Sequence, residues 1–456
     1  MSKLLVKLRY RKRPKGRVNA CTGIKKFCLF FIFSLFTVFL SVSLVSCGPK
    51  VEKKEQVNSI KIWHWMSDRE DAFLELAKRY KAETGVKVNF ELYAPSDAYT
   101  QKVRAAAQTN TLPDIFGILG EKRDFASFVR SDYIYNLTEE MDKENGAWKN
   151  KLFAKALSVN EFEQGNSFDV KPGTYGVPID VTNIQMLYNK DLLQAAGVEA
   201  SNPPKTWMEL IEINKKLKAK GVQGLVSGWG ETWMIDCLAS NYAFNIMGKD
   251  KVLATIRGEV PYTDPDWIKV FDLFREMRDE GFLASGIVTM VNKTAEQLFA
   301  NNRAAFAFNG SWCVNVYRGM NPDLNYGAML PPQASDKYPM VIWGGAGSSF
   351  MVNKQSKNIR EAVDFLKWIT DAPQQIFLSK ETQDLPSNKY SLKDIPMVLS
   401  QFASAMDNTT HPNVWGVSEF PIVIEAFDKG IQSIIIGEKT PEQLAQEVQA
   451  VKERLR

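Results

Sequence analysis

The sequence predicts an α/β protein, and three observations support that prediction. The chain of 456 residues is 45% hydrophobic and 24% charged, the composition of a globular protein with two or three domains. Between residues 59 and 116, segments of alternating hydrophobicity are separated by segments with helical spacing, which is the order that builds an open parallel sheet. Helix signals then recur to the end of the chain without tandem repeats.

The first elements are defined by periodicity and by capping residues. Residues 59–65 alternate as a strand, and Ser67 with Glu70 forms a capping box for a helix that ends near Gly85. A second strand, a helix and a short buried strand follow: residues 86–92, 98–109 and 112–116.

The end of the first strand and the loop after the third are predicted to border a binding site. In open parallel sheets, ligands bind beyond the carboxyl ends of the strands. This rule places Trp63, His64, Trp65 and the loop 117–121 at the rim of a site.

The rest of the chain contains the same kinds of signals. Thr206 with Glu209 predicts a capped helix that runs to about residue 220, and Thr294 with Gln297 predicts another. The remaining predicted elements are an apolar run over 304–308, a helix over 357–370 and a final helix capped at Thr440.

The N-terminus has the pattern of an export signal. Residues 1–46 carry ten basic side chains and no acidic ones, and residues 27–45 are an uncharged run of 19. Leu44 to Cys47 resembles a bacterial lipobox, which implies cleavage after residue 46, a lipid on Cys47 and a tether over 47–57. The alternative is an uncleaved signal anchor, since 19 apolar residues span a bilayer. Both readings export the chain and tether it to a membrane.

Charge and composition exclude several classes of site. Residues 47–456 hold 47 basic and 52 acidic side chains, so the basic surface that binds nucleic acid is not expected. Only two histidines, His64 and His411, are present, so no metal site is expected. Beyond the leader, Cys237 and Cys313 join Cys47, and the sequence leaves open whether they pair or stay as free buried thiols.

Nucleotide and nucleophile motifs are absent from the sequence. There is no Walker A loop, no Gly-x-Gly-x-x-Gly after a strand and no Gly-x-Ser-x-Gly elbow, so no cofactor is expected. A pair drawn from Glu121, Asp180 and Glu231 remains possible for glycoside hydrolysis, because the separation that matters there is spatial.

Tryptophans indicate the ligand class more directly. Of the 11 tryptophans, Trp229, Trp312, Trp343 and Trp415 lie beside or near glycine in loop-like contexts. A flat aromatic face covers the C–H patches of a sugar ring, while nearby polar groups bind its hydroxyls. The set predicts a carbohydrate site with at least two ligand-facing tryptophans.

An ordered series of short motifs resembles the family 1 extracellular solute-binding proteins, the sugar receptors of bacterial ABC importers that include maltose-binding protein. The resemblance covers nearly all of residues 58–455. Its markers are Thr84–Val88, Leu112–Ile115, Tyr175–Pro178, Leu187–Leu193, Ala196–Val198, Pro204–Trp207, Ala304–Trp312, Gly344-Gly345, Phe365–Trp368 and Thr440–Glu442.

The resemblance implies two α/β lobes, with the ligand in a cleft between them and hinge segments that cross between the lobes. Its hinges correspond to Asp180–Thr182, Leu330–Pro332 and Leu385–Ser387 in this chain. The lobes are then expected to cover 58–180 with 331–386, and 181–330 with 387–456.

The resemblance also implies which side chains line the cleft, although His-Trp-Met after the first strand departs from the pattern of some members. To these positions the tryptophan argument adds Trp415. The expected ligand-binding residues are His64, Trp65, Glu121, Asp180, Asn183, Trp229, Glu231, Asn309, Trp312, Trp343, Gly344, Gly345 and Trp415.

The function implied is that of a monomeric receptor without enzymatic activity. It binds a sugar or oligosaccharide, closes about its hinge and delivers the ligand to a permease driven by a separate ATPase. Three alternatives stay open: a receptor for a polyamine or phosphate ester, a sensor partner of a membrane kinase, and a secreted glycan-processing enzyme.

Overall fold

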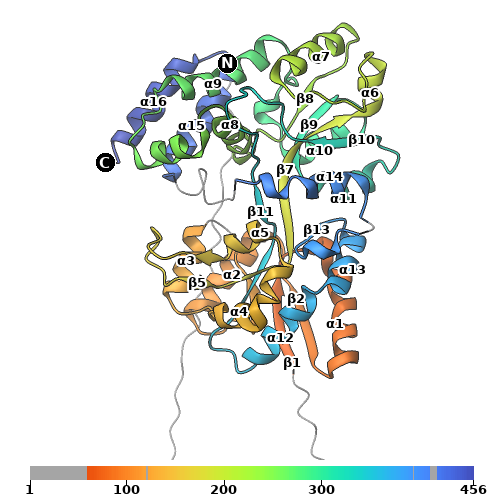
Figure 1. The fold of residues 1–456 in the computed structure, drawn as a ribbon, viewed down its shortest axis with the longest axis vertical. Coiled ribbons are helices and arrows are strands. Elements are labelled where there is room, and N and C mark those ends of the chain that lie inside the picture. Colours follow the sequence, from red (N-terminus) through yellow and green to blue (C-terminus); the bar gives the residue numbers. More distant parts are fainter. Residues whose placement is uncertain (1–58, 120–121, 394, 411–418, 456) are drawn as a thin grey trace, which may run out of the picture. The chain divides into compact units, whose positions relative to one another are not determined.

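The structure is a computed structural model that describes residues 59–119, 122–393, 395–410 and 419–455 (Figure 1). The predicted signal peptide over 1–46, the lipidation site Cys47 and the tether to residue 57 lie outside the described residues, as do Glu121 and Trp415.

Among the described residues, a first sheet of five strands has the order β2-β1-β3-β12-β6. Strands β1 (Ser59–His64), β2 (Lys87–Leu92) and β3 (Ile115–Gly117) are parallel. Helices α1 (Glu70–Thr84) and α2 (Ser96–Gln108) connect them, which confirms the predicted alternation of strands and helices. Strands β12 (Ser349–Val352) and β6 (Val177–Pro178) join the sheet from later in the chain.

A second sheet in the described part of the chain has the order β10-β7-β9-β8. Its longest strand is β7 (Asp180–Asn189), which is antiparallel to β9 (Phe306–Gly310) and β10 (Tyr326–Met329). The short strand β8 (Leu225–Val226) runs parallel to β9. The pairing places residues from four distant parts of the sequence in one layer.

The remaining elements surround these sheets (Figure 1). In the first half they are α3 (Lys122–Arg130), α4 (Thr138–Gly146), α5 (Ala154–Val159), the β4–β5 pair (Glu161–Phe162 and Gly173–Thr174), α6 (Lys190–Ala195), α7 (Trp207–Ala219) and α8 (Trp233–Arg257). In the second half they are α9 (Pro265–Asp279), α10 (Asn292–Ala300), α11 (Cys313–Met320), α12 (Ile359–Ile369), α13 (Ala372–Thr382), α14 (Met397–Ser404), α15 (Pro421–Ile435) and α16 (Pro441–Glu453). Five short 3-10 turns complete the described chain: η1 (Ser67–Arg69), η2 (Lys149–Lys151), η3 (Ile287–Thr289), η4 (Lys389–Ser391) and η5 (Met406–Asn408).

Two of the predicted helix starts are confirmed in detail. Thr206 and Glu209 form a reciprocal capping box at α7, and Thr440 and Gln443 form one at α16. The start predicted at Ser67 is wrong, because η1 precedes α1 and no side chain caps α1.

Three segments of chain link the first sheet to β7. The first enters β7 directly from β6 through residue 179, and the second joins β11 (Gly344–Ala346) to β12 through residues 347–348. The third contains β13 (Leu385–Pro386), which pairs with the first two residues of β7. We call these three stretches the crossing segments.

The predicted crossing at Leu330–Pro332 is wrong. After β10, Gln333 bridges to Thr206, and Met340 belongs to the apolar core beside the second sheet. The apolar side chains between residues 334 and 343 therefore pack with the core beside the second sheet, and the second crossing segment follows them in the chain.

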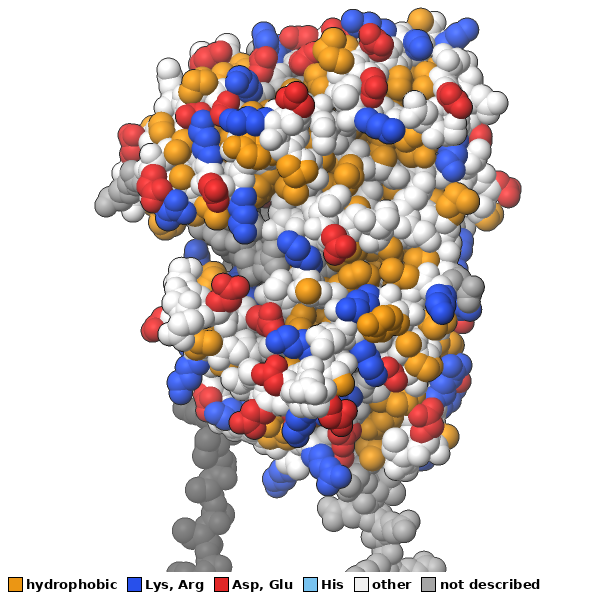
Figure 2. Space-filling model, in the orientation of Figure 1, with side chains coloured by type: hydrophobic (Ala, Val, Ile, Leu, Met, Phe, Trp, Pro, Cys, Tyr) orange, Lys and Arg blue, Asp and Glu red, His pale blue; other side chains and the backbone are white. Residues whose placement is uncertain are grey.

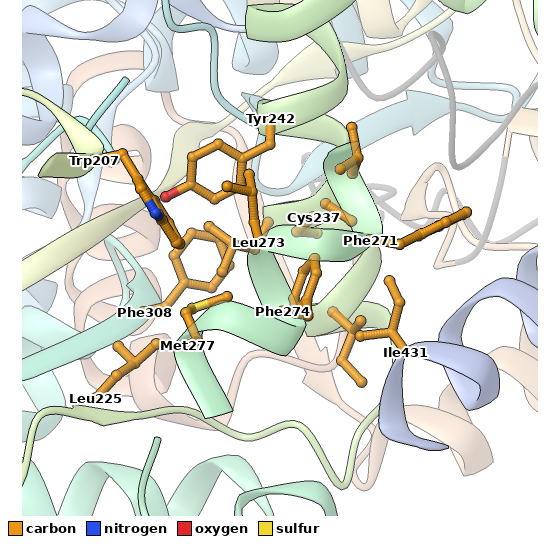
Figure 3. Packing of buried hydrophobic residues seen from close by; sticks show 14 of the residues in the cluster. Trp207, Leu225, Cys237, Tyr242, Phe271, Leu273, Phe274, Met277, Phe308 and Ile431 are labelled. Atoms are coloured by element: carbon orange, nitrogen blue, oxygen red, sulfur yellow. The ribbon is translucent and has the colours of Figure 1, made fainter. Parts of the chain in front are cut away.

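The largest core packs α7, α8, α9 and α15 against the second sheet (Figure 3). The rings of Trp207 and Tyr242 pack edge to face with their centroids 5.5 Å apart, and the ring centroids of Phe271 and Phe427 are 5.1 Å apart. Cys237 in this core and Cys313, the first residue of α11, are both buried free thiols, which answers the question of pairing that the sequence left open.

Charged side chains of both signs are interspersed on the face shown in Figure 2. No helix in the described part of the chain is long and apolar enough to cross a membrane. Within the same residues, no three His, Cys, Asp or Glu side chains gather as a metal site.

The core of the second sheet predicts a strong response to truncation. Phe274→Ala is expected to lower the free energy of unfolding by about 3–5 kcal/mol, because a fully buried ring is removed from a packed site. Guanidinium unfolding measures the change. The exposed Met208→Ala serves as the control and is expected to stay within about 0.5 kcal/mol of wild type; equal effects would contradict the packing described.

Candidate functional site

A cavity of about 220 Å³ lies where the crossing segments meet. Its lining combines aromatic, hydroxyl-bearing and charged side chains with short stretches of backbone. The residues that line it are Arg69, Asp180, Val181, Thr182, Trp233, Ser311, Trp312, Trp343, Ala346, Gly347, Ser348 and Asp384.

Three tryptophans form one wall of this cavity. Trp233 begins α8 and is 39% exposed, and its ring centroid lies 6.1 Å from that of Trp312 at an interplanar angle of 46°. Trp343 lies directly before β11, and its backbone N–H donates to Asn241 Oδ1 at 3.1 Å. Each ring projects from the end of a regular element, so the fold positions the wall without a long loop.

Gly310, at the end of β9, allows the Trp312 ring to pack directly against the strand. A Cβ atom added at Gly310 would lie 1.9 Å from the Trp312 ring, so no side chain fits between ring and strand. Glycine is therefore the residue that permits this close approach.

Hydroxyl groups lie beside the aromatic wall. Thr182 Oγ1 and Ser311 Oγ are 3.0 Å apart, one from β7 and one from the turn after β9. Ser348 borders the cavity from the second crossing segment. Hydroxyls both donate and accept hydrogen bonds, so this part of the cavity matches a ligand with hydroxyls of its own.

A buried ion cluster forms the charged side of the cavity. One terminal nitrogen of Arg69 donates to Asp180 Oδ2, and Arg69 Nε lies 3.0 Å from Asp384 Oδ2. Asp180 is 2% exposed, and its other carboxylate oxygen accepts from the backbone N–H of Ser348. We call Arg69, Asp180 and Asp384 the Arg69 cluster.

Burial and mutual attraction act in opposite directions on the pKa values of the cluster. Burial raises the pKa of Asp384 to about 6 and also raises that of Asp180, although Arg69 counteracts both shifts. Burial alone would lower the pKa of Arg69, but the carboxylates of Asp180, Asp384 and Asp68 raise it above its ordinary value. The guanidinium therefore stays charged at every accessible pH.

Three of the predicted site residues line the cavity: Asp180, Trp312 and Trp343. Gly344 and Gly345 lie next to it in β11, where their backbone pairs with Asn183 and Thr182. They serve in strand pairing and are not part of the cavity lining.

Four predicted ligand contacts are instead core side chains, and we reassign them. Asn183 donates to the backbone oxygen of Phe402 at 2.9 Å, and Asn309 donates to Glu296 Oε1 at 3.1 Å. Trp229 is fully buried against Phe274 with ring centroids 5.7 Å apart.

His64 is the fourth reassigned residue. Its ring is fully buried at the edges of Phe73 and Phe90, 5.1 and 5.7 Å between centroids, and its Nε2 lies 2.9 Å from Glu70 Oε2. Burial, assisted by the positive charge of Arg69, lowers its pKa to about 4. A neutral imidazole in the core suits packing and does not reach the cavity.

Two predicted residues lie outside the lining. Trp65 is half-buried, with its ring 5.1 Å from Tyr99 and packed over Gly117, where an added Cβ would lie 2.3 Å from the indole. Glu231 accepts from the backbone N–H of Asn292 at 2.8 Å and so holds the start of α10.

Six polar, charged or aromatic lining side chains were missed by sequence reasoning: Arg69, Thr182, Trp233, Ser311, Ser348 and Asp384. Strand periodicity would have found Thr182, because residues i and i+2 of a strand share a face while Asn183 points the opposite way from Thr182. Trp233 follows Trp229 by four residues at the start of α8, and it is the exposed one of these two tryptophans. Nothing in the local sequence marks Asp384, which is separated by 204 positions from Asp180.

Comparison with known proteins places these features in context. A family model described as bacterial extracellular solute-binding protein matches residues 75–401. The chain is similar to the multiple sugar-binding protein of Streptococcus mutans, with 22% identity over 73% of this chain and 76% of that one. It is also similar to the sn-glycerol-3-phosphate-binding periplasmic protein UgpB of Shigella flexneri, with 22% identity over 85% and 90%.

A solved structure shares the fold. The cyclic alpha-maltosyl-1,6-maltose binding protein from Arthrobacter globiformis superposes with a TM-score of 0.68 at 20% identity, over 87% of this chain and 98% of that chain. The described residues thus have the two-lobed periplasmic-binding-protein fold, in which crossing segments join the lobes.

The environment of His64 predicts an imidazole that stays neutral in mild acid. Its folded pKa of about 4 lies below the ordinary 6.5, so the neutral ring stabilises the fold above pH 6.5 and this stability is lost as pH falls toward 4. Since the chain has two histidines, NMR of histidine-labelled protein gives two ring signals. The signal absent from His64→Asn should not move between pH 7.5 and 5; titration near 6.5 would contradict the burial described.

Proposed function

Because the chain belongs to the bacterial extracellular solute-binding proteins, we propose that it is a receptor that binds a sugar or oligosaccharide at the tryptophan-lined cavity. The relatives described above are binding proteins and not enzymes. Catalysis is therefore not part of the proposal, and the carboxylates near the cavity are assigned to the Arg69 cluster.

The observation that supports a sugar most strongly is the combination of Trp233, Trp312 and Trp343 with the hydroxyls of Thr182 and Ser311. Aromatic faces cover the apolar faces of a pyranose ring, and the hydroxyls complement the groups on its edge. A pocket of this kind offers contacts to an uncharged ligand rich in hydroxyls.

The Arg69 cluster favours a neutral ligand over a charged one. Among the described lining residues, Arg69 is the cation, and two carboxylates already surround it. A phosphate ester would have to compete with those carboxylates, and a polyamine would compete with the guanidinium for them. The phosphate ester bound by UgpB and a polyamine are therefore the controls for the test.

We further propose how the ligand is delivered, and membership of the family supports this proposal. The ligand binds while the cleft is open, the lobes close about the crossing segments, and a permease powered by a separate ATPase takes it up. Closure adds contacts that exist in the closed state, so the ligand shifts an equilibrium between two states. A lipid on Cys47 would hold this monomeric receptor at the outer face of the membrane, and a role as a sensor partner remains compatible with the same binding step.

Thermal unfolding of residues 48–456 tests the ligand class. The panel is maltotriose, raffinose, chitotriose and xylotriose, with glycerol-3-phosphate and spermidine as controls. A ligand present at about 1,000 times its dissociation constant adds about 4 kcal/mol of stability, which gives a clear shift in Tm. A shift with a sugar supports the proposal; a shift with a control ligand alone would replace the ligand class.

The tryptophan wall gives a direct prediction of affinity. Trp312→Ala and Trp233→Ala are each expected to weaken sugar binding by about 1–3 kcal/mol, since stacking area is lost. Isothermal titration calorimetry measures the loss.

Two matched tryptophans serve as controls for this prediction. Trp368 lies outside the cavity, where its Nε1 donates to Glu83 Oε2 at 2.6 Å, and Trp229 is a core residue. Their alanine variants should therefore lower the stability of the protein and leave the dissociation constant for the sugar unchanged. Unchanged affinity in both Trp312→Ala and Trp233→Ala would contradict the stacking model.

A further inference from the structure

The three crossing segments meet at the Arg69 cluster. Asp180 is the first residue of β7, the strand that continues into the second sheet. Its carboxylate accepts from the backbone N–H of Ser348 in the second crossing segment and from Arg69. Arg69 in turn lies against Asp384, the residue directly before β13 in the third crossing segment.

Arg69 itself is part of the first sheet's connections. It ends η1, the turn that links β1 to α1, so its backbone is fixed by the first sheet while its guanidinium reaches the segments that lead to the second. The side chain is almost completely buried and is surrounded by Asp180, Asp384 and Asp68. One rigid, forked cation thus joins the first sheet to two of the crossing segments directly.

Away from the cavity, the cluster is packed closely against the crossing segments. A Cβ atom added at Gly347 would lie 2.4 Å from Asp180 Oδ1, so the second crossing segment packs directly on the carboxylate. On the other side, buried Gln375 of α13 donates to the backbone oxygen of Ile179 at 3.0 Å and accepts from Ser387 N at 2.7 Å. The first and third crossing segments are therefore joined both by the pairing of β13 with β7 and by the Gln375 side chain.

Stability alone does not account for such a cluster. Buried ion pairs lose about as much in desolvation as they gain in attraction, and well-packed apolar groups are often equal or better. What a guanidinium shared by two carboxylates does provide is fixed geometry among the segments it joins.

We propose that the Arg69 cluster is a positioning device: it fixes the crossing segments relative to the first sheet and thereby sets the ligand affinity of the cavity without itself binding the ligand. This inference rests on the proposed function, because affinity is one of its readouts. It assigns Arg69, Asp180 and Asp384 to the balance between open and closed states, and it leaves ligand contact to the tryptophans and hydroxyls.

Titration of Asp384 makes the device testable. Burial raises the pKa of Asp384 to about 6, so in the folded protein this carboxylate takes up a proton between pH 7.5 and 5. In the unfolded chain the same carboxylate is protonated at a lower pH. Because the folded state binds the extra proton, this group adds stability as pH falls through 6, and the effect is lost as pH rises. The groups that face it are Arg69, Asp180 and Asp68, with the Thr382 hydroxyl from α13, while His64 faces Arg69 from β1.

The experiment compares wild type with Asp384→Asn, which keeps the size of the side chain and removes its titration. Small-angle X-ray scattering of ligand-free protein at pH 7.5 and pH 5 reports the distribution of open and closed forms. Asp371→Asn is the matched control, since Asp371 is an exposed aspartate at the other end of α13 that pairs with Lys151 at 2.8 Å. A second variant, Arg69→Lys, keeps the charge and removes the fork.

The expected result is a change in the wild-type radius of gyration between the two pH values that Asp371→Asn retains and Asp384→Asn lacks. Affinity for the best sugar of the panel should change about threefold across the same interval in wild type and much less in Asp384→Asn. Arg69→Lys should alter ligand-free scattering at both pH values. In the proposal these variants remove no ligand contact. A cluster that served stability alone would therefore not change the scattering or the affinity in this way.

Two outcomes separate the inference from the proposed function. If a sugar binds but Asp384→Asn keeps the wild-type dependence of scattering and affinity on pH, the positioning role is overturned. If no panel member binds wild type, the proposed ligand class fails, while the ligand-free scattering of the three variants still supports or overturns the role of the cluster.

Discussion

The architecture depends on β7, a strand whose ten residues are all buried. Its first residues pair with β11 and β13, and its later residues pair with β9 and β10, so one strand takes part in the crossing region and in the second sheet. Buried backbone groups must be hydrogen-bonded. The pairing therefore fixes the register of four other strands, and with it the positions of every side chain that β7 presents to the cavity.

The cavity is a consequence of that register. Thr182 points to the side of Asp180 because strand residues alternate, and Ser311 reaches Thr182 because β9 pairs with β7 up to Gly310. The tryptophans come from the starts of α8 and α11 and from the residue before β11, which are ends of elements held by their own cores. The backbone of each tryptophan is therefore positioned by a regular element.

Charge is distributed differently from what the composition indicates. The face shown in Figure 2 mixes both signs, while beside the cavity Arg69 and Asp180 are buried and Asp384 is 12% exposed. The buried location matters because interactions between charges are stronger away from water. The Arg69 cluster therefore lies where its charges interact strongly, beside the cavity and between the crossing segments.

The sequence by itself determined the α/β class, the first strands and helices, and the capping boxes at Thr206 and Thr440. These features depend on periodicity and on contacts within a few residues, which the sequence records directly. It also placed Asp180, Trp312 and Trp343 at the cavity, but it assigned His64, Asn183, Trp229 and Asn309 there as well. Only tertiary structure decided which indole lies in the core, where the second crossing falls, and that Arg69 meets Asp384. Burial and ion pairing between segments hundreds of positions apart arise from packing, and no local pattern encodes them.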